Sequence, residues 1–384
     1  MVSGIDSHSR IITAPAANPF LISIRAQTRP LLIITSSSRT AEDLTEDLRN
    51  LHPHVFEFPA WETLPHERLS PRSETVAKRI STLNSLAQLP AGAQPIVVAP
   101  IRAAIHRFIS SLARTPLRTL SLGEEVSLTD LVHHLSSLAY SRTDLVEKRG
   151  EFAVRGGILD VFLPLADYPV RIDFFGDEIE EMRYFDIADQ RTTKPVEGAI
   201  TIIPCRELLI TEEIQEAAEK LKSKYPSALE VLDKIAQGIS TDGMESLIPL
   251  LVKDQETIFD RISANSEIIF IDEERIKSRT ADLIETNTEF FEASWSNASL
   301  GGSVPMPVAE ESYLDWDSLH ELITSRGFHP ISLNAFGTDL DDGAFFTDLN
   351  PIEQMRGNVE RLIQLLTDGL NMQQSVLFSV SGHG

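Results

Sequence analysis

The chain has 384 residues and a mass of 42.7 kDa, more than one compact core accommodates, so we expect about two to four domains. Its formal net charge of −23 argues against a broad DNA-binding face, because an acidic surface repels phosphate. The single cysteine, Cys205, excludes an internal disulfide and a cysteine-based zinc cluster. No apolar run approaches the roughly 18 residues of a membrane span, and the first ten residues lack the pattern of a signal peptide. These features predict a cytoplasmic protein without a membrane segment.

The first 117 residues alternate between strand and helix signals. Short β-rich runs predict buried strands at 11–13, 31–35, 55–58 and 96–99. Between them, Thr40 opens one predicted helix over 40–51, and Ser73 caps another over 74–89. This order of strands and helices is typical of a parallel β/α domain of the Rossmann or P-loop type.

The pattern changes near residue 118. A strand and a helix capped by Ser127 or Thr129 are followed by strand signals alone, over 151–164 and 168–187. The step Phe175-Gly-Asp-Glu178 separates two alternating runs and predicts the turn of an antiparallel hairpin. The predicted fold class is therefore α/β, with an antiparallel sheet domain inserted into a parallel β/α domain whose P-loop is degenerate.

From about residue 206 the sequence is helical again, with one buried strand predicted at 268–272. A looser stretch at 294–307 predicts a linker or a surface excursion. The last segment predicts a helix over 351–370 and a strand over 375–380 that no helix follows. We therefore expect the chain to be a piece of a longer protein.

The loop after the first strand lacks a phosphate-binding motif. A P-loop needs glycines and a lysine, because backbone amides and an ammonium group together hold the phosphates. Residues 13–20 contain neither, and Pro15 and Pro19 have no amide hydrogen. We therefore expect no nucleotide site of the usual kind, no catalytic residues and no bound cofactor in this chain.

Two other patterns have enzymatic interpretations. Asp272 and Glu273 end an apolar strand, as in a Walker B motif, where carboxylates hold Mg²⁺ and orient water; this would make the chain a nucleotide hydrolase. The competing interpretation, favoured in the absence of a P-loop, is the acidic first turn of a helix. Residues 379–384 resemble a nucleophile elbow but lack its first glycine and its helix. The histidines have no suitably spaced companions, so no metal site is predicted.

Alternation in the predicted antiparallel sheet separates an inner face from an outer one. Along one strand it places Arg171 and Phe175 on the outer face, and along another it places Ala153 and Arg155 there. The glycines at 156–157 permit a bulge or a close backbone approach just past Arg155. An exposed aromatic beside two arginines has the composition of an interface hot spot.

A second interpretation of the same residues is open. Arg171 pairs with Asp160 or Asp173 on a solvated face, and Phe175 tucks under the hairpin turn. Under either interpretation DNA is not the expected partner, because residues 141–191 contain seven basic and twelve acidic side chains.

Several motifs, in a fixed order, give the chain a resemblance to a known family. They are Phe58-Pro-Ala-Trp61-Glu-Thr-Leu-Pro65-His-Glu-Arg68-Leu-Ser-Pro71, Arg149-Gly-Glu-Phe-Ala-Val-Arg155-Gly-Gly-Ile-Leu-Asp160, Arg171-Ile-Asp-Phe-Phe-Gly-Asp-Glu-Ile179, Phe185-Asp-Ile-Ala-Asp-Gln-Arg191, Asp242-Gly-Met-Glu245 and the surroundings of Leu300-Gly301-Gly302. Together they resemble the N-terminal UvrB-like region of the bacterial transcription-repair coupling factors. The resemblance covers essentially the whole chain.

This resemblance implies domains 1a, 2 and 1b of the repair helicase UvrB, without its ATP site and its damage-probing hairpin. It implies a domain 1a with a degenerate nucleotide fold at 1–117, a domain 2 at 118–205, a domain 1b at 206–350, and the truncated start of a further β/α domain at 351–384. Domain 2 is the part that the family shares with UvrB for binding UvrA. The motif match assigns UvrA contacts to Arg155, Arg171 and Phe175.

The resemblance also implies what lies outside the chain. Members of the family have an RNA-polymerase-binding domain, a motor that uses ATP and Mg²⁺ to move on duplex DNA, and a C-terminal domain expected to cover the UvrA-binding surface until activation. The function expected of this chain is the recruitment of UvrA to lesions where RNA polymerase has stalled, which couples transcription to nucleotide excision repair. Contacts with polymerase and DNA are expected only through the missing regions.

Overall fold

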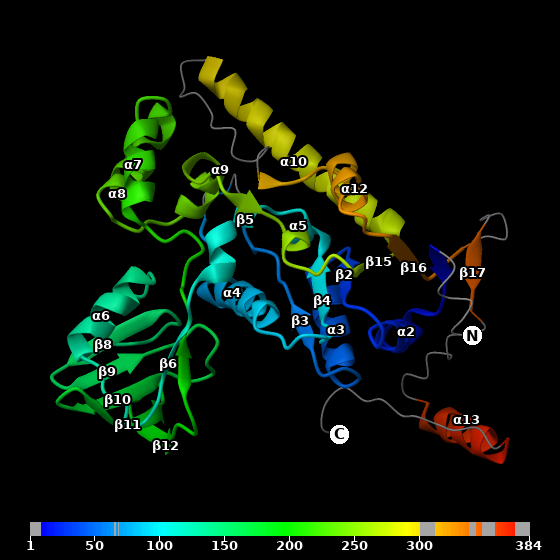
Figure 1. Ribbon diagram of the computed structural model, residues 1–384, viewed down its shortest axis with the longest axis horizontal. Helices are drawn as coiled ribbons and strands as arrows, with labels where there is room; N and C mark the ends of the chain where they lie inside the picture. Colours follow the sequence, from blue (N-terminus) through cyan, green and yellow to red (C-terminus); the bar gives the residue numbers. More distant parts are fainter. Residues whose placement is uncertain are drawn as a thin grey trace.

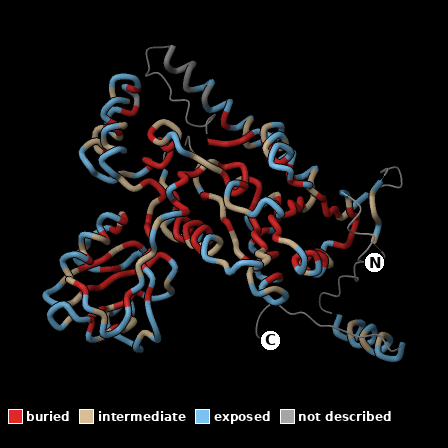
Figure 2. The backbone as a smooth tube through the Cα atoms, in the orientation of Figure 1, coloured by how far each residue is buried: buried red, intermediate tan, exposed pale blue. Residues whose placement is uncertain are grey.

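A computed structural model of the chain describes residues 9–64, 67, 69–299, 312–337, 343–347 and 358–372. These residues form a parallel-sheet domain, an antiparallel sheet domain and a group of short helices (Figure 1). Buried positions follow the strands of both sheets (Figure 2). The predicted α/β class with a separate antiparallel sheet domain is confirmed.

The parallel-sheet domain is built on seven strands in the order β17-β1-β16-β15-β2-β4-β3, every neighbouring pair parallel. The strands are β1 (Arg10–Ile12), β2 (Leu31–Thr35), β3 (Val55–Glu57), β4 (Ile96–Pro100), β15 (Glu267–Ile271), β16 (Pro330–Asn334) and β17 (Ala344–Phe346). The predicted intervals 1–117 and 206–350 both contribute strands to this one sheet, whereas 118–205 contributes none.

Helices cover both faces of the parallel sheet. Along β2, Leu31 and Ile33 enter one apolar core, and Leu32 and Ile34 enter the other. The first core is closed by α2 (Asn18–Arg25) and α3 (Ser38–Arg49). The second is closed by α4 (Ser73–Ala87), α5 (Ile101–Ala104), α10 (Glu273–Ser299) and α12 (Trp316–Ser325). Burial on both faces explains why these strands read as continuous apolar runs.

The antiparallel sheet domain has the strand order β12-β11-β10-β9-β8-β7. Its strands are β7 (Ser141–Arg142), β8 (Glu151–Arg155), β9 (Ile158–Val161), β10 (Val170–Phe175), β11 (Glu178–Phe185) and β12 (Thr192–Pro195). All its pairs are antiparallel except β7 with β8. One face packs on α6 (Leu128–Ser137), together with the strand pair of β6 (Arg118–Leu120) and β13 (Ile200–Ile202).

The third part is a group of short helices with an apolar core of its own. It consists of α7 (Glu212–Leu221), α8 (Leu229–Ala236) and α9 (Ile248–Leu251), with 3-10 turns at η4 (Pro226–Ala228) and η5 (Met244–Leu247). Further short elements are η1 (Pro15–Ala17), η3 (Ser110–Arg114), η6 (Ile258–Asp260) and the antiparallel pair of β5 (Phe108–Ile109) and β14 (Gln255–Glu256). Helix α13 (Val359–Asn371) stands apart from the other elements (Figure 1).

Several predicted boundaries were wrong. Helix α3 begins at Ser38, because Ser37 is its N-cap and accepts a hydrogen bond from the Thr40 amide at 3.2 Å. Ser73 is the first residue of α4 and not its cap. Helix α10 continues to Ser299 through the first part of the predicted linker 294–307.

Ser127 caps α6, as one of the two predicted alternatives had it. Other predictions cannot be compared with the structure: the rest of the 294–307 linker, the strand at 375–380 and residues 351–357 lie outside the described residues.

The segment that leaves the antiparallel sheet domain is anchored by two ion pairs. Arg79 of α4 donates from Nε to Glu207 Oε1 at 2.6 Å, and both side chains are fully buried. Trp61 Nε1 donates to the same carboxylate oxygen at 2.9 Å. The neighbouring Arg206 donates to Glu245 Oε1 at 3.0 Å. These contacts fix residues 206 and 207, where the chain leaves the antiparallel sheet domain, to α4, Trp61 and η5. Removing one partner of such a buried pair would leave the other charge without a partner.

Candidate protein-binding site on the antiparallel sheet

Phe175 and Arg155 lie at the same end of the antiparallel sheet, here called the Phe175 end. Arg155 is paired with Ile158 in the β8–β9 hairpin, and Ile158 is paired with Asp173, two residues before Phe175. Phe175 is 76% exposed, although it is the last residue of β10. The interpretation in which Phe175 tucks under the hairpin turn is therefore wrong.

Glycines shape both hairpins at the Phe175 end. Gly176 has a φ of +64° in the turn between β10 and β11, a conformation that favours glycine. A Cβ on Gly157 would lie 3.2 Å from the carbonyl oxygen of Phe174, whose amide donates to the Gly157 carbonyl at 2.9 Å. The predicted close backbone approach past Arg155 is confirmed.

Arg171 is held within the outer face instead of projecting from it. Its Nε and Nη2 donate to the two carboxylate oxygens of Asp160 at 2.7 and 2.9 Å. Nη1 donates to the Gln190 carbonyl at 3.3 Å, and the guanidinium lies 5.1 Å from the ring centroid of Phe185. The hydrogen bond to Asp160 raises the pKa of Arg171, which stays charged. The ion pair between Arg171 and Asp160 was one of the open alternatives, and it is confirmed.

The outer face near Arg171 carries an apolar cluster that pattern reasoning missed. Val146, Ala153, Phe162 and Phe185 pack together there, and Ala153 is buried. Ala153 thus lies on the outer face, as predicted, but this part of the face is covered by the cluster and is not open to solvent. The available signal was the pair of aromatic residues Phe162, one position beyond β9, and Phe185, the last residue of β11.

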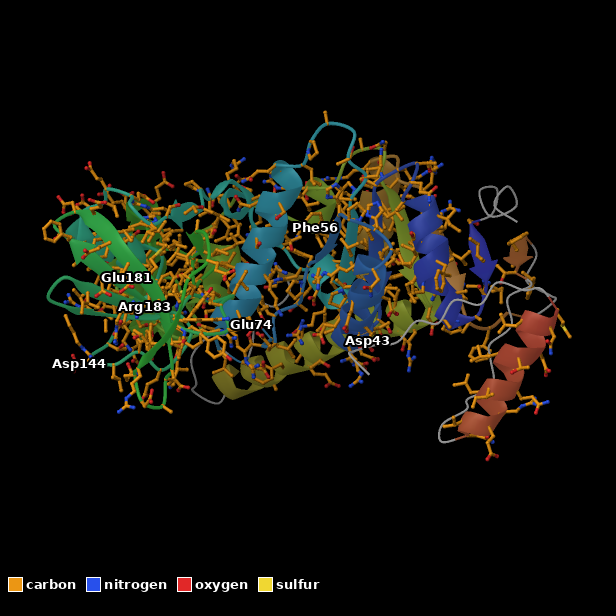
Figure 3. All side chains as sticks on the ribbon, turned by 90° about the horizontal axis from the view of Figure 1, so that it is seen from below. Asp43, Phe56, Glu74, Asp144, Glu181 and Arg183 are labelled. Carbon is orange, nitrogen blue, oxygen red and sulfur yellow. The ribbon has the colours of Figure 1, made fainter. Side chains whose placement is uncertain are left out.

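Acidic side chains dominate the surroundings of the site. Glu181 on β11 forms an ion pair with Arg183 at 2.5 Å, and Asp144 lies toward the outer edge of the same domain (Figure 3). Glu178 is paired across the strands with Phe175 and is exposed. The site therefore offers an exposed aromatic ring and guanidinium groups within an acidic frame, a composition that suits protein recognition more than phosphate binding.

The two residues with a possible Walker B interpretation, Asp272 and Glu273, lie at the start of a helix. Asp272 has a φ of +63° and accepts the Ile276 amide on its carbonyl, so that α10 starts at Glu273 with acidic residues in its first turn. The amide of Glu273 donates to Asn334 Oδ1 at 3.3 Å. This is the geometry of the helix interpretation.

At the P-loop position, residues 15–17 form a 3-10 turn and Pro19 lies in the first turn of α2. Across the described ranges, no group of three or more metal-binding side chains occurs. Within the same part of the chain, no helix is long and apolar enough to cross a membrane.

Comparison with known proteins agrees with this architecture. Residues 119–208, which contain the antiparallel sheet and the Phe175 end, match the family described as the UvrB interaction domain. The chain is 41% identical over 370 residues to the transcription-repair-coupling factors of Mycobacterium tuberculosis (strain CDC 1551 / Oshkosh) and Mycobacterium bovis, a match that covers 90% of this chain and 30% of each relative. It is 29% identical over 274 residues to that of Escherichia coli (strain K12), covering 69% of this chain and 22% of the relative.

The antiparallel sheet thus lies in the part of the chain that matches the UvrB interaction domain. Over the matched residues the chain belongs to the transcription-repair-coupling factor family, and it spans about 30% of the length of the first two relatives.

Proposed function

We propose that the chain is the UvrA-binding part of a transcription-repair-coupling factor. In this proposal the antiparallel sheet domain contacts UvrA through the Phe175 end and so brings excision repair to a stalled RNA polymerase. The match of residues 119–208 to the UvrB interaction domain supports the partner class. The observation that carries the site is the 76% exposure of Phe175, a large aromatic side chain next to the turn of a hairpin.

The two arginines have different parts in the proposal. Arg155 is exposed and donates to the Asp144 carbonyl, so its remaining donors are available to a partner. Arg171 forms three hydrogen bonds within the domain, two to Asp160 and one to Gln190, and its side chain is 20% exposed. Phe175 therefore supplies most of the apolar contact, Arg155 supplies hydrogen bonds, and Arg171 acts mainly by keeping the outer face in shape.

Other activities of the family belong to regions beyond this chain in the same proposal. RNA polymerase binding, and translocation on DNA with ATP and Mg²⁺, are assigned to those regions, and none is assigned to the residues described. The proposal places the protein in the cytoplasm, and a C-terminal domain covers the Phe175 end before activation.

A titration of the chain against purified UvrA tests the proposal. Phe175→Ala is expected to weaken binding roughly 30-fold, the effect of losing about 2 kcal/mol at a hot spot. Phe336→Ala is the matched control, because Phe336 is 89% exposed in the parallel-sheet domain. Equal affinities for the parent and the Phe175 variant would contradict the site. No binding by a folded parent chain would contradict the function.

A further inference from the structure

Two loops on the outer face of the antiparallel sheet are tied to each other by one side chain. Gln190 Nε2 donates to the carbonyl of Val146 at 3.3 Å and to the carbonyl of Ile187 at 2.9 Å. The backbones at these two positions are therefore within reach of a single nitrogen atom. Gln190, in the 186–191 turn, has a φ of +60°. Residues other than glycine rarely adopt this left-handed backbone conformation.

The predicted contact arginines brace the same two loops. Arg155 donates from Nη2 to the carbonyl of Asp144, in the first loop. Arg171 donates from Nη1 to the carbonyl of Gln190, in the second. Beneath them, Val146 and Phe185 belong to the buried apolar cluster of the outer face. The loops are thus fixed to the sheet from below and to each other from the side.

Each braced loop presents one large apolar side chain to solvent. Leu145 is 40% exposed in the first loop, and Ile187 is 37% exposed in the second. Charged residues border them, since Asp144, Asp186 and Asp189 are all exposed. The exposed part of each of these side chains gains nothing from folding, whereas a preorganised apolar contact with a polar rim benefits binding.

We propose that Leu145 and Ile187, here called the loop pair, form a second apolar contact of the UvrA-binding surface. This inference rests on the proposed function and extends its site from the Phe175 end across the outer face. The same UvrA molecule contacts the loop pair and the Phe175 end, because Arg155 and Arg171 connect the two. A complementary surface on UvrA would be an apolar patch bordered by basic side chains, which complement the aspartates.

The inference is tested with the double variant Leu145→Ser/Ile187→Ser of the full chain. Both side chains are partly exposed, so the fold is expected to stay intact, as circular dichroism and thermal unfolding would show. Binding to purified UvrA is expected to weaken about tenfold. The matched control is Leu229→Ser/Ile239→Ser, which changes the same residue types at 50% and 49% exposure in the short-helix group.

The outcomes separate this inference from the proposed function. Binding by the parent, loss in Phe175→Ala and unchanged affinity in the loop-pair variant would overturn the loop pair and leave the function standing. A parent chain that does not bind UvrA would overturn both.

Hydrogen exchange gives an independent measurement that needs no variant. Amides at 143–147 and 186–190 are expected to exchange several-fold more slowly when UvrA is added, and unchanged exchange there would contradict the inference.

Discussion

Asp160 and Arg171 face each other across β9 and β10 and form an ion pair with two hydrogen bonds, in which the Asp160 side chain is 3% exposed. This geometry makes Arg171 part of the domain's internal structure as well as of its surface. A carboxylate at that depth loses two charged hydrogen bonds when its partner is removed, so the consequence of losing Arg171 is structural before it is functional.

Arg171→Ala is therefore expected to lower the free energy of unfolding by about 3 kcal/mol, since it leaves the Asp160 carboxylate buried without a cation. Urea denaturation measures the change. Arg183→Ala is the control, and its partly exposed pair with Glu181 is expected to contribute less than about 1 kcal/mol. The double variant Asp160→Asn/Arg171→Ala should recover part of the loss, and an Arg171→Ala loss no larger than that of Arg183→Ala would contradict this account.

Gly150→Ala is expected to destabilise the chain by about 2 kcal/mol. Gly150 has a φ of +85°, and a Cβ there would lie 3.1 Å from the Sγ of Cys205. Gly123→Ala separates strain from crowding, because Gly123 has a φ of +76° with no atom within 4 Å of the added Cβ; it should lose only about 1 kcal/mol. Thermal unfolding compares the two variants, and equal losses would show that contact with Cys205 has no part.

The thiol of Cys205 is expected to be inert in the folded chain. Burial raises its pKa to about 12, so almost no thiolate is present at neutral pH. Alkylation by iodoacetamide, followed by mass spectrometry, should be slow under native conditions and fast in urea. Because Cys205 is the only cysteine in the chain, the modification can be assigned without ambiguity. Rapid stoichiometric labelling of folded protein would contradict the burial.

Stability is expected to fall as the pH decreases below about 6.5. His106 is buried, and desolvation, followed by the nearby charges of Arg79 and Arg102, holds its pKa well below the value of 6.5 that applies in the unfolded chain. Between the folded and the unfolded pKa of His106, the unfolded chain binds more protons than the folded chain, so acid favours unfolding. Above pH 6.5 His106 is neutral in both states and causes no loss of stability. His106→Phe should flatten this part of the curve, measured by urea titrations at pH 5 to 8. Identical slopes for parent and variant would contradict the assignment, and His133→Gln, at an exposed position of α6, controls for the substitution itself.

Local patterns were enough to predict the β10–β11 hairpin and to place Phe175 on the outer face, although its exposure was only one of two open alternatives. Alternation defines which face a side chain takes, and the Phe175-Gly-Asp-Glu178 step supplies the turn. The helix that follows Asp272 was also readable, because acidic residues in a first turn complement the helix dipole.

Contacts between distant segments could not be predicted in this way. Strand β1 pairs with β16, more than 300 residues later in the chain. The periodicity of a strand predicts which of its faces is buried but not which strand lies beside it. The burial of Ala153 depends on Phe185 and Val146, which reach the outer face from other segments. The hydrogen bond from Gln190 to the Val146 carbonyl depends on a positive φ at Gln190, and a glutamine in the sequence does not predict a positive φ.

Site-specific photo-crosslinking would show whether the Phe175 end touches UvrA. A photoreactive phenylalanine analogue placed at position 175 of the full chain is predicted to form a covalent product with purified UvrA on irradiation. The same analogue at position 336, in the parallel-sheet domain and equally open to solvent, should form none. Crosslinking from position 336 but not from 175, by chains of equal stability, would contradict the account.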